Sequence, residues 1–139
     1  MQLKRETLSG RSDPVDEAAI ISLAIEQASR ARYRLLLANP AKRRRLLDKL
    51  NHQPPLDPRF TKWFRSFHHA LAEVAVPSST RVYLLSAAPR LDRRATTFGE
   101  AIVDVPAEGW GTIIGVSDQL ALYYGEVGER AAVISRSAS

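Results

Sequence analysis

The sequence predicts an α+β fold, in which three N-terminal helices pack on a small, mainly antiparallel C-terminal sheet. Three observations support this prediction. The chain has 139 residues, the length of one ordinary domain. Helical periodicity and helix-start signals dominate residues 14–75, whereas short apolar runs bounded by turn residues dominate from residue 81 onward. Strands that follow helices as a group favour an α+β fold over alternating βαβ units.

Each expected helix begins at an aspartate or asparagine that is followed by proline. The acidic or amide side chain caps the helix by accepting an otherwise unpaired backbone N–H. Proline suits the first helical position because its missing N–H would be unpaired there. These pairs predict helices over residues 14–38, 40–51 and 58–75.

The helix expected over residues 58–75 has the strongest periodic signal in the chain. Its apolar residues follow the spacing i, i+3, i+4, i+7: Phe60, Trp63, Phe64, Phe67, Leu71 and Val74. An aromatic stripe of this regularity is more often core packing than a ligand-binding box. We therefore expect this face, with Trp63, Phe64 and Phe67, to lie on the sheet.

The second half of the chain is expected to form the sheet. Apolar runs predict strands over residues 81–87, 111–117, 119–126 and 130–135. Short gaps between the last three favour an antiparallel meander. Thr97 and Glu100 have the spacing of a capping box, which predicts a short helix near 97–105, although "AIVDV" in this segment could instead pair as a strand.

Composition excludes several classes of protein. The chain has no cysteine, which rules out disulfides, thiolate metal sites and cysteine nucleophiles. No apolar run approaches the roughly 18 residues that a membrane-spanning helix needs. The N-terminus lacks the apolar core of a signal peptide, so the expected location is the cytoplasm. One domain is expected over residues 1–139, with mobile tails at 1–12 and 135–139.

Charge is unevenly distributed along the chain. Residues 1–65 hold 14 Lys or Arg against 7 Asp or Glu, whereas residues 66–139 hold 6 against 8. Such asymmetry points to an acidic partner for the first half. A second explanation competes with it, because Arg outnumbers Lys by 16 to 4 and GC-rich coding alone can produce that bias.

The basic run at Lys42–Arg45 does not form a single cationic face. At about 100° per residue, Lys42, Arg45 and Lys49 fall together, opposite the leucines of the same helix. Arg43 falls on the leucine side, so it must extend its head group to solvent or find an acidic partner. An ordinary amphipathic helix also presents such a basic stripe to water.

No sequence motif indicates catalysis or a cofactor. The glycines of "GWGTIIG" precede a strand, whereas a dinucleotide-binding loop would precede a helix. Adjacent His68 and His69 diverge by about 100° on a helix, which disfavours a shared metal. Glu100 and Asp104 are better explained as an exposed helix face than as an acid–base pair. We therefore expect no cofactor and no metal, and an enzyme only through residues scattered along the sequence.

The function that the sequence favours is a non-enzymatic protein-binding or regulatory module with a basic helical surface. Its partner is expected to be an acidic protein or a second copy of the chain. Nucleic-acid binding through the same residues is the alternative, although the aromatic residues expected for it are predicted to face inward. An enzyme of unknown type comes third, and no membrane partner is expected. The predicted surface consists of Arg30, Arg34, Lys42, Arg45, Lys49, Lys62 and Arg65.

Overall fold

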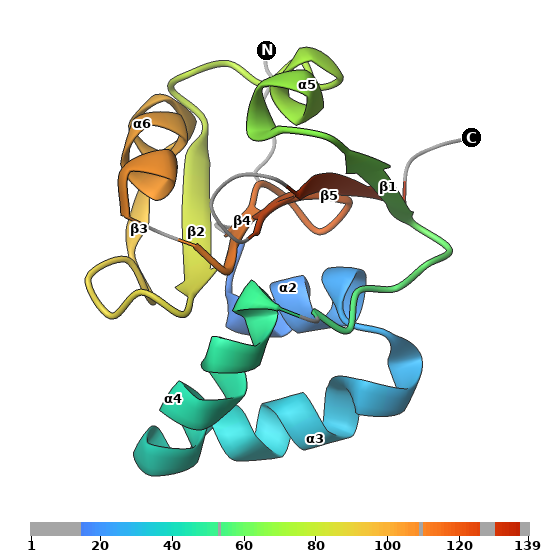
Figure 1. The fold of residues 1–139 in the computed structure, drawn as a ribbon, viewed down its shortest axis with the longest axis vertical. Coiled ribbons are helices and arrows are strands. Elements are labelled where there is room, and N and C mark those ends of the chain that lie inside the picture. The colour runs from blue at the N-terminus through green and yellow to red at the C-terminus, as the bar shows by residue number, and fades with distance from the viewer. Residues whose placement is uncertain (1–14, 53, 109, 126–129, 137–139) are drawn as a thin grey trace, which may run out of the picture.

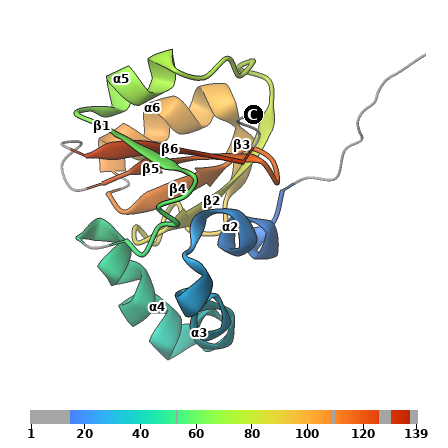
Figure 2. The same ribbon diagram turned by 90° about the vertical axis from the view of Figure 1, so that its right-hand side faces the viewer.

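A computed structural model describes residues 15–52, 54–108, 110–125 and 130–136. Within them a six-stranded sheet carries helices on both faces, which confirms the predicted α+β class (Figures 1 and 2). The helices are α2 (Glu17–Ala24), α3 (Gln27–Leu37), α4 (Pro40–Asp48), the 3₁₀ turn η1 (Lys49–Asn51), α5 (Phe67–Ala72) and α6 (Phe98–Glu108). The strands are β1 (Thr61–Phe64), β2 (Arg81–Ser86), β3 (Ala95–Thr97), β4 (Thr112–Gly115), β5 (Leu120–Tyr124) and β6 (Ala131–Ser135).

The sheet has the strand order β1-β6-β5-β4-β2-β3, and every neighbouring pair is antiparallel. The predicted meander is confirmed as β4-β5-β6. The structure adds two strands that the sequence did not indicate, β1 and β3, and they form the two edges of the sheet. None of the helices described is long and apolar enough to cross a membrane.

Side chains alternate along each strand, so the sheet contributes to two separate cores. Ile113 and Tyr123 are paired across β4 and β5 and pack with α2, α3 and α4. Ile114 and Leu122 are also paired and face the opposite way, toward α5 and α6. Figure 2 shows this arrangement, with α5 and α6 on one face of the sheet and α2 to α4 on the other.

The single helix predicted over residues 14–38 is wrong in one respect, because the chain breaks it into α2 and α3. Ile25 leaves helical geometry and forms an isolated antiparallel bridge with Leu56. The Asp57 N–H donates to the Ala24 carbonyl at 2.8 Å, and the Glu26 N–H donates to the Pro55 carbonyl at 2.8 Å. These long-range backbone bonds replace helical ones. The predicted cap, Asp13, lies outside the described residues, and Asp16 caps α2 instead.

The helix predicted over residues 40–51 is confirmed as α4 and η1. Asn39 has extended backbone geometry, and its side-chain oxygen accepts the Lys42 N–H at 3.1 Å. Pro40 occupies the first turn, as the sequence predicts. The last turn tightens into a 3₁₀ turn at Lys49.

The helix predicted over residues 58–75 is wrong. Thr61–Phe64 forms β1 and pairs with β6, and only Phe67–Ala72 is helical, with Ser66 as its cap. Asp57 therefore caps no helix. The Trp63 side chain, expected in the core, is 42% exposed, whereas Phe67 is buried. Pairing with β6 outweighs the helical pattern because the same aromatic residues also suit a strand.

The segment after Thr97 is a helix, as expected from the capping-box spacing. Thr97 Oγ1 accepts the Glu100 N–H at 3.3 Å. The helix, α6, runs to Glu108 and is longer than predicted, with Pro106 in its last turns. At the C-terminus, Ser135 belongs to β6, and the Arg136 N–H donates to the Gln119 carbonyl. The other residues of the predicted tails lie outside the described part of the chain.

Candidate basic binding groove

The seven residues of the predicted basic surface do not lie together. Arg30 and Arg34 belong to α3, whereas Lys42, Arg45 and Lys49 belong to α4 and η1. Lys62 lies on the edge strand β1, where it pairs with Glu73 at 3.2 Å, and Arg65 follows the end of that strand. The structure therefore divides the predicted surface into three parts with different surroundings.

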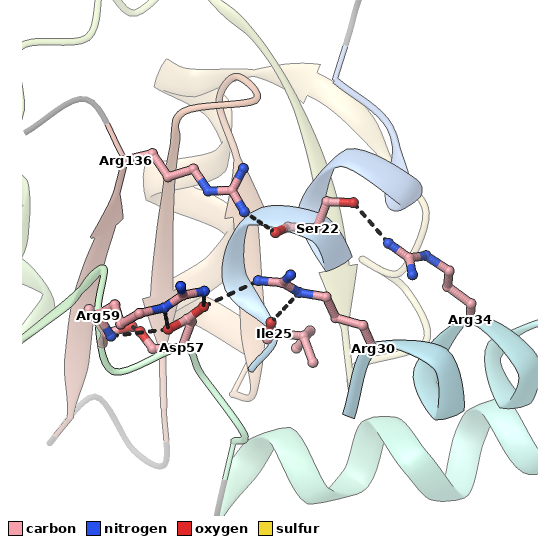
Figure 3. Close-up of polar contacts among 8 residues, drawn as sticks. Ser22, Ile25, Arg30, Arg34, Asp57, Arg59 and Arg136 are labelled. Carbon is pink, nitrogen blue, oxygen red and sulfur yellow. Dashed lines mark hydrogen bonds and ion pairs between the residues drawn. The ribbon is translucent and has the colours of Figure 1, made fainter. Parts of the chain in front are cut away.

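Arg30 and Arg34 stabilise the break between α2 and α3, as Figure 3 shows. Arg30 Nε donates to the Ile25 carbonyl at 2.8 Å, and its Nη2 donates to Asp57 Oδ2 at 3.2 Å. Arg34 Nη2 donates to the Ser22 hydroxyl at 2.9 Å. Both guanidinium groups therefore hold the fold locally, and neither is free for a partner in the way that the sequence suggested.

Asp57 lies at the centre of the contacts beside this break and interacts with both Arg30 and Arg59. Its carboxylate is buried and accepts hydrogen bonds from the backbone N–H and the guanidinium of Arg59, in addition to Arg30. The side-chain hydrogen bond from Arg59 lowers the pKa of Asp57, although burial acts in the opposite direction. A carboxylate that is held ionised by two guanidinium groups has no capacity for proton transfer near neutral pH, so we assign it a structural role.

The part of the predicted surface on α4 and η1, namely Lys42, Arg45 and Lys49, lines a hollow between α3 and α4. We call this hollow the basic groove. It has a volume of about 230 Å³. Two leucines form part of its lining, and four basic side chains complete it. The lining residues are Leu36, Leu46, Arg32, Lys42, Arg45 and Lys49.

Helix geometry explains how these residues meet. Lys42, Arg45 and Lys49 recur at the three- and four-residue spacing that places side chains on one helical face. Leu46, four residues after Lys42, lies beside them, so the prediction that the leucines lie opposite the cations is wrong for this residue. Arg32 and Leu36 are four residues apart on α3 and share a face in the same way. Arg32 was not among the predicted surface residues, although its four-residue spacing from Leu36 was the signal that could have identified it.

The positive charge of the basic groove is not neutralised within the described part of the chain. The side chains of Arg32, Lys42, Arg45 and Lys49 make no ion pair or hydrogen bond with another described residue. Most other cations with a defined contact are paired with an acid, as in Arg90–Glu108 and Arg94–Asp104. The groove is therefore a site of concentrated, unpaired positive charge.

Arg43 lies on the other side of α4 and is buried, with 5% of its surface exposed. The prediction that it must find an acidic partner is confirmed, because it forms ion pairs with Glu17 and Asp92. Burial alone would lower its pKa, but the hydrogen bonds that Arg43 donates to these two carboxylates outweigh that effect and raise it. This arginine therefore anchors α4 and does not contribute to the basic groove.

The basic groove has the chemistry of a binding site for anionic groups. Its cations can donate hydrogen bonds to carboxylates or phosphates, and its leucines can contact apolar side chains. Among the described residues, no group of three or more His, Asp or Glu is placed to hold a metal ion. The chain matches no known protein-family model, and no significantly similar curated protein or solved structure was found.

Proposed function

We propose that this protein is a non-enzymatic binding module, whose basic groove binds an acidic segment of a partner protein. A single observation carries the proposal: four unpaired cations line one hollow together with two leucines, the partly buried Leu36 and the buried Leu46. A solvated helix face would present its charges outward and would not need an apolar floor between them. The combination suits a partner that offers carboxylates and an apolar side chain together.

The energies involved favour a segment that is both acidic and apolar. Exposed ion pairs contribute only about 0–1 kcal/mol each, so charge alone gives weak binding. Burial of one leucine-sized side chain adds about 1.5–3 kcal/mol. Leu35 lies three residues after Arg32 and is 74% exposed, so it extends the apolar surface beside the groove. We infer that the partner segment is an amphipathic helix with carboxylates along one side.

A second copy of the chain fits the groove less well than a separate partner. The acidic second half of the sequence suggested self-association, but several of its acids are already paired. Asp104 pairs with Arg94 at 3.5 Å, and Glu108 pairs with Arg90 at 3.3 Å. Binding in the groove would require these pairs to break, which offsets the gain.

The test uses a fluorescent, synthetic amphipathic peptide with glutamates on one side and leucines on the other. Replacement of Lys42, Arg45 and Lys49 by glutamine should weaken binding about tenfold, since three exposed pairs contribute roughly 0.5 kcal/mol each. The matched control replaces Arg44, Arg81 and Arg93, three exposed arginines outside the groove, and removes the same charge. An equal loss in both triple variants would show that only the overall charge matters and would refute the proposal.

Nucleic acid remains the alternative ligand of the same groove. Competition with generic duplex DNA at about 150 mM salt distinguishes the two ligands, because phosphate-dominated binding falls steeply with salt. We expect the DNA to leave the peptide bound. Complete displacement at this salt concentration would favour the alternative.

A further inference from the structure

The aromatic side chains of the β1 region are unusually rich in contacts with cations. Phe60 lies under the guanidinium groups of Arg59 and Arg136, at 4.9 and 5.1 Å from its ring centroid. Arg130 lies over Trp63 at 4.3 Å, and Lys62 lies over Phe64 at 5.4 Å. All four cation–π contacts found among the described residues involve rings within residues 60–64.

Trp63 is the most accessible of these aromatic residues. The register places it opposite Ala132, whose other neighbour is Tyr123, so its ring lies on the α2–α4 face of the sheet. The ring meets Tyr123 edge to face, with centroids 5.8 Å apart. Because β1 is an edge strand, nothing in the sheet covers its outer side, and the Trp63 side chain stays 42% exposed.

Protection against aggregation explains only part of this arrangement. Edge strands commonly carry Lys or Arg so that other strands cannot pair with them. Lys62 on this four-residue strand and Arg65 immediately after it are sufficient for that purpose, since both are exposed. An exposed tryptophan does not help and adds apolar surface at the edge. Its position under the Arg130 guanidinium suits a different role.

We propose that β1 is a stacking platform for single-stranded nucleic acid. One base would stack on the Trp63–Arg130 pair, and the exposed Arg65, just after the end of β1, would contact the adjacent phosphate. Proteins that bind single strands combine aromatic faces with arginine and lysine in this way, and stacking tolerates any base. Duplex bases remain stacked on one another, so the platform discriminates against them. This inference concerns a different surface and ligand from the basic groove and does not depend on it.

The test measures the binding of fluorescein-labelled oligo(dT) and oligo(U) by fluorescence anisotropy at about 50 mM salt, where phosphate contacts are strong. Trp63→Leu keeps apolar volume but removes the ring, and should weaken binding about five- to 150-fold, the loss of one stacked base. Trp63→Phe keeps a ring and should lose much less. Arg65→Gln should flatten the slope of log affinity against log salt by about 0.7, one phosphate contact on a single strand.

An independent readout comes from the fluorescence of Trp63 itself. The chain has two tryptophans, so a Trp110→Phe background leaves Trp63 as the sole emitter. Stacking of a base should quench this emission as oligonucleotide is added. The triple variant at Arg44, Arg81 and Arg93, which lie outside both β1 and the basic groove, serves as the matched control, and should still bind and quench.

Three results would overturn the platform. The first is no measurable binding of either oligonucleotide at low salt. The second is equal binding of duplex and single strands that is insensitive to Trp63→Leu. The third is loss of oligonucleotide binding only in the variant of the basic groove, which would assign nucleic acid to the groove. The first two results do not bear on peptide binding in the groove, and after the third the peptide assay itself shows whether the groove also binds the peptide. Failure of one proposal is therefore distinguishable from failure of the other.

Discussion

Arg43 of α4 and Asp92, in the loop between β2 and β3, form a two-point ion pair. Arg43 Nε donates to Asp92 Oδ2 at 2.8 Å, and Nη2 donates to Oδ1 at 3.0 Å. The same guanidinium donates to both carboxylate oxygens of Glu17 in α2, at 3.0 and 2.7 Å. One side chain therefore ties three parts of the chain together, while its neighbours in the basic run line the groove.

The first prediction is that Arg43→Gln lowers the free energy of unfolding by about 3 kcal/mol, the lower end of the range for breaking a buried ion pair. The lower end applies because the Glu17 and Asp92 side chains remain 26% and 15% exposed, so water can partly solvate them. Chemical denaturation measures the change. The control is Arg44→Gln, an exposed neighbour, which should stay within about 0.5 kcal/mol of the wild type.

Arg43→Gln also tests whether the role of Arg43 in stability is separate from peptide binding in the groove. Because Arg43 points away from the groove, peptide affinity should stay unchanged at temperatures where Arg43→Gln is folded. A variant with unaltered stability and weakened peptide binding would contradict our assignment of the two sides of α4.

The second prediction concerns the pH dependence that Asp57 contributes. Its pKa is lowered in the folded protein by the hydrogen bond from Arg59, so its stabilising effect is present above the unfolded pKa of about 3.9. That effect is lost as the pH falls through the folded pKa. Asp57→Asn should therefore be less stable than the wild type at pH 7, and the difference should shrink progressively as the pH falls below the unfolded pKa.

Urea denaturation of both proteins across this pH range measures the difference directly. Other carboxylates titrate in both proteins, so their contributions cancel. A difference that is constant down to the lowest pH would mean that the carboxylate charge of Asp57 contributes nothing to stability.

Local chemistry made part of the fold predictable from the sequence. Asn39 and Pro40 define a helix start through interactions within one turn, and the structure has that cap. The meander strands are joined by short connections, which force neighbouring strands to pair antiparallel. The break at Ile25 was not predictable in this way, because its partner, Leu56, lies far along the chain.

The basic groove, like the fold, was predictable from the sequence only in part. Lys42, Arg45 and Lys49 followed from helical periodicity within one helix, which the structure preserves. Arg30 and Arg34 were predicted for the same surface, but they turn to Asp57 and Ser22 because α2 ends early. Where the position of a side chain depended on a residue distant in the sequence, helical periodicity alone could not predict that position.

The third prediction contrasts two aromatic residues that the sequence placed on one helical stripe. Phe67 is buried and stacks edge to face on Tyr124 at 5.1 Å, so Phe67→Ala should cost about 3–5 kcal/mol. Trp63→Ala should cost less, because much of the Trp63 ring already contacts water. Unfolding midpoints of the two variants test the order, and the reverse order would favour the continuous helix that the sequence suggested.

The fourth prediction concerns the close approach of α2 to the sheet at Gly115 of β4. A Cβ atom at Gly115 would lie 2.6 Å from Ile20 Cγ1 and 2.7 Å from Ile20 Cδ1, inside van der Waals contact. Ile20 is fully buried, so its side chain has little room to move. Gly115→Ala should therefore cost about 1–3 kcal/mol through overpacking.

A double-mutant cycle with Ile20→Val identifies the cause of that cost. The valine lacks Cδ1, one of the two clashing atoms, and should cost about 0.5–1.5 kcal/mol alone. If the clash is the cause, Gly115→Ala should be less destabilising in the Ile20→Val background than in the wild type, with an interaction energy above about 0.5 kcal/mol. Strict additivity would show instead that α2 moves away from the sheet as a unit, and that the glycine is not required for its close packing.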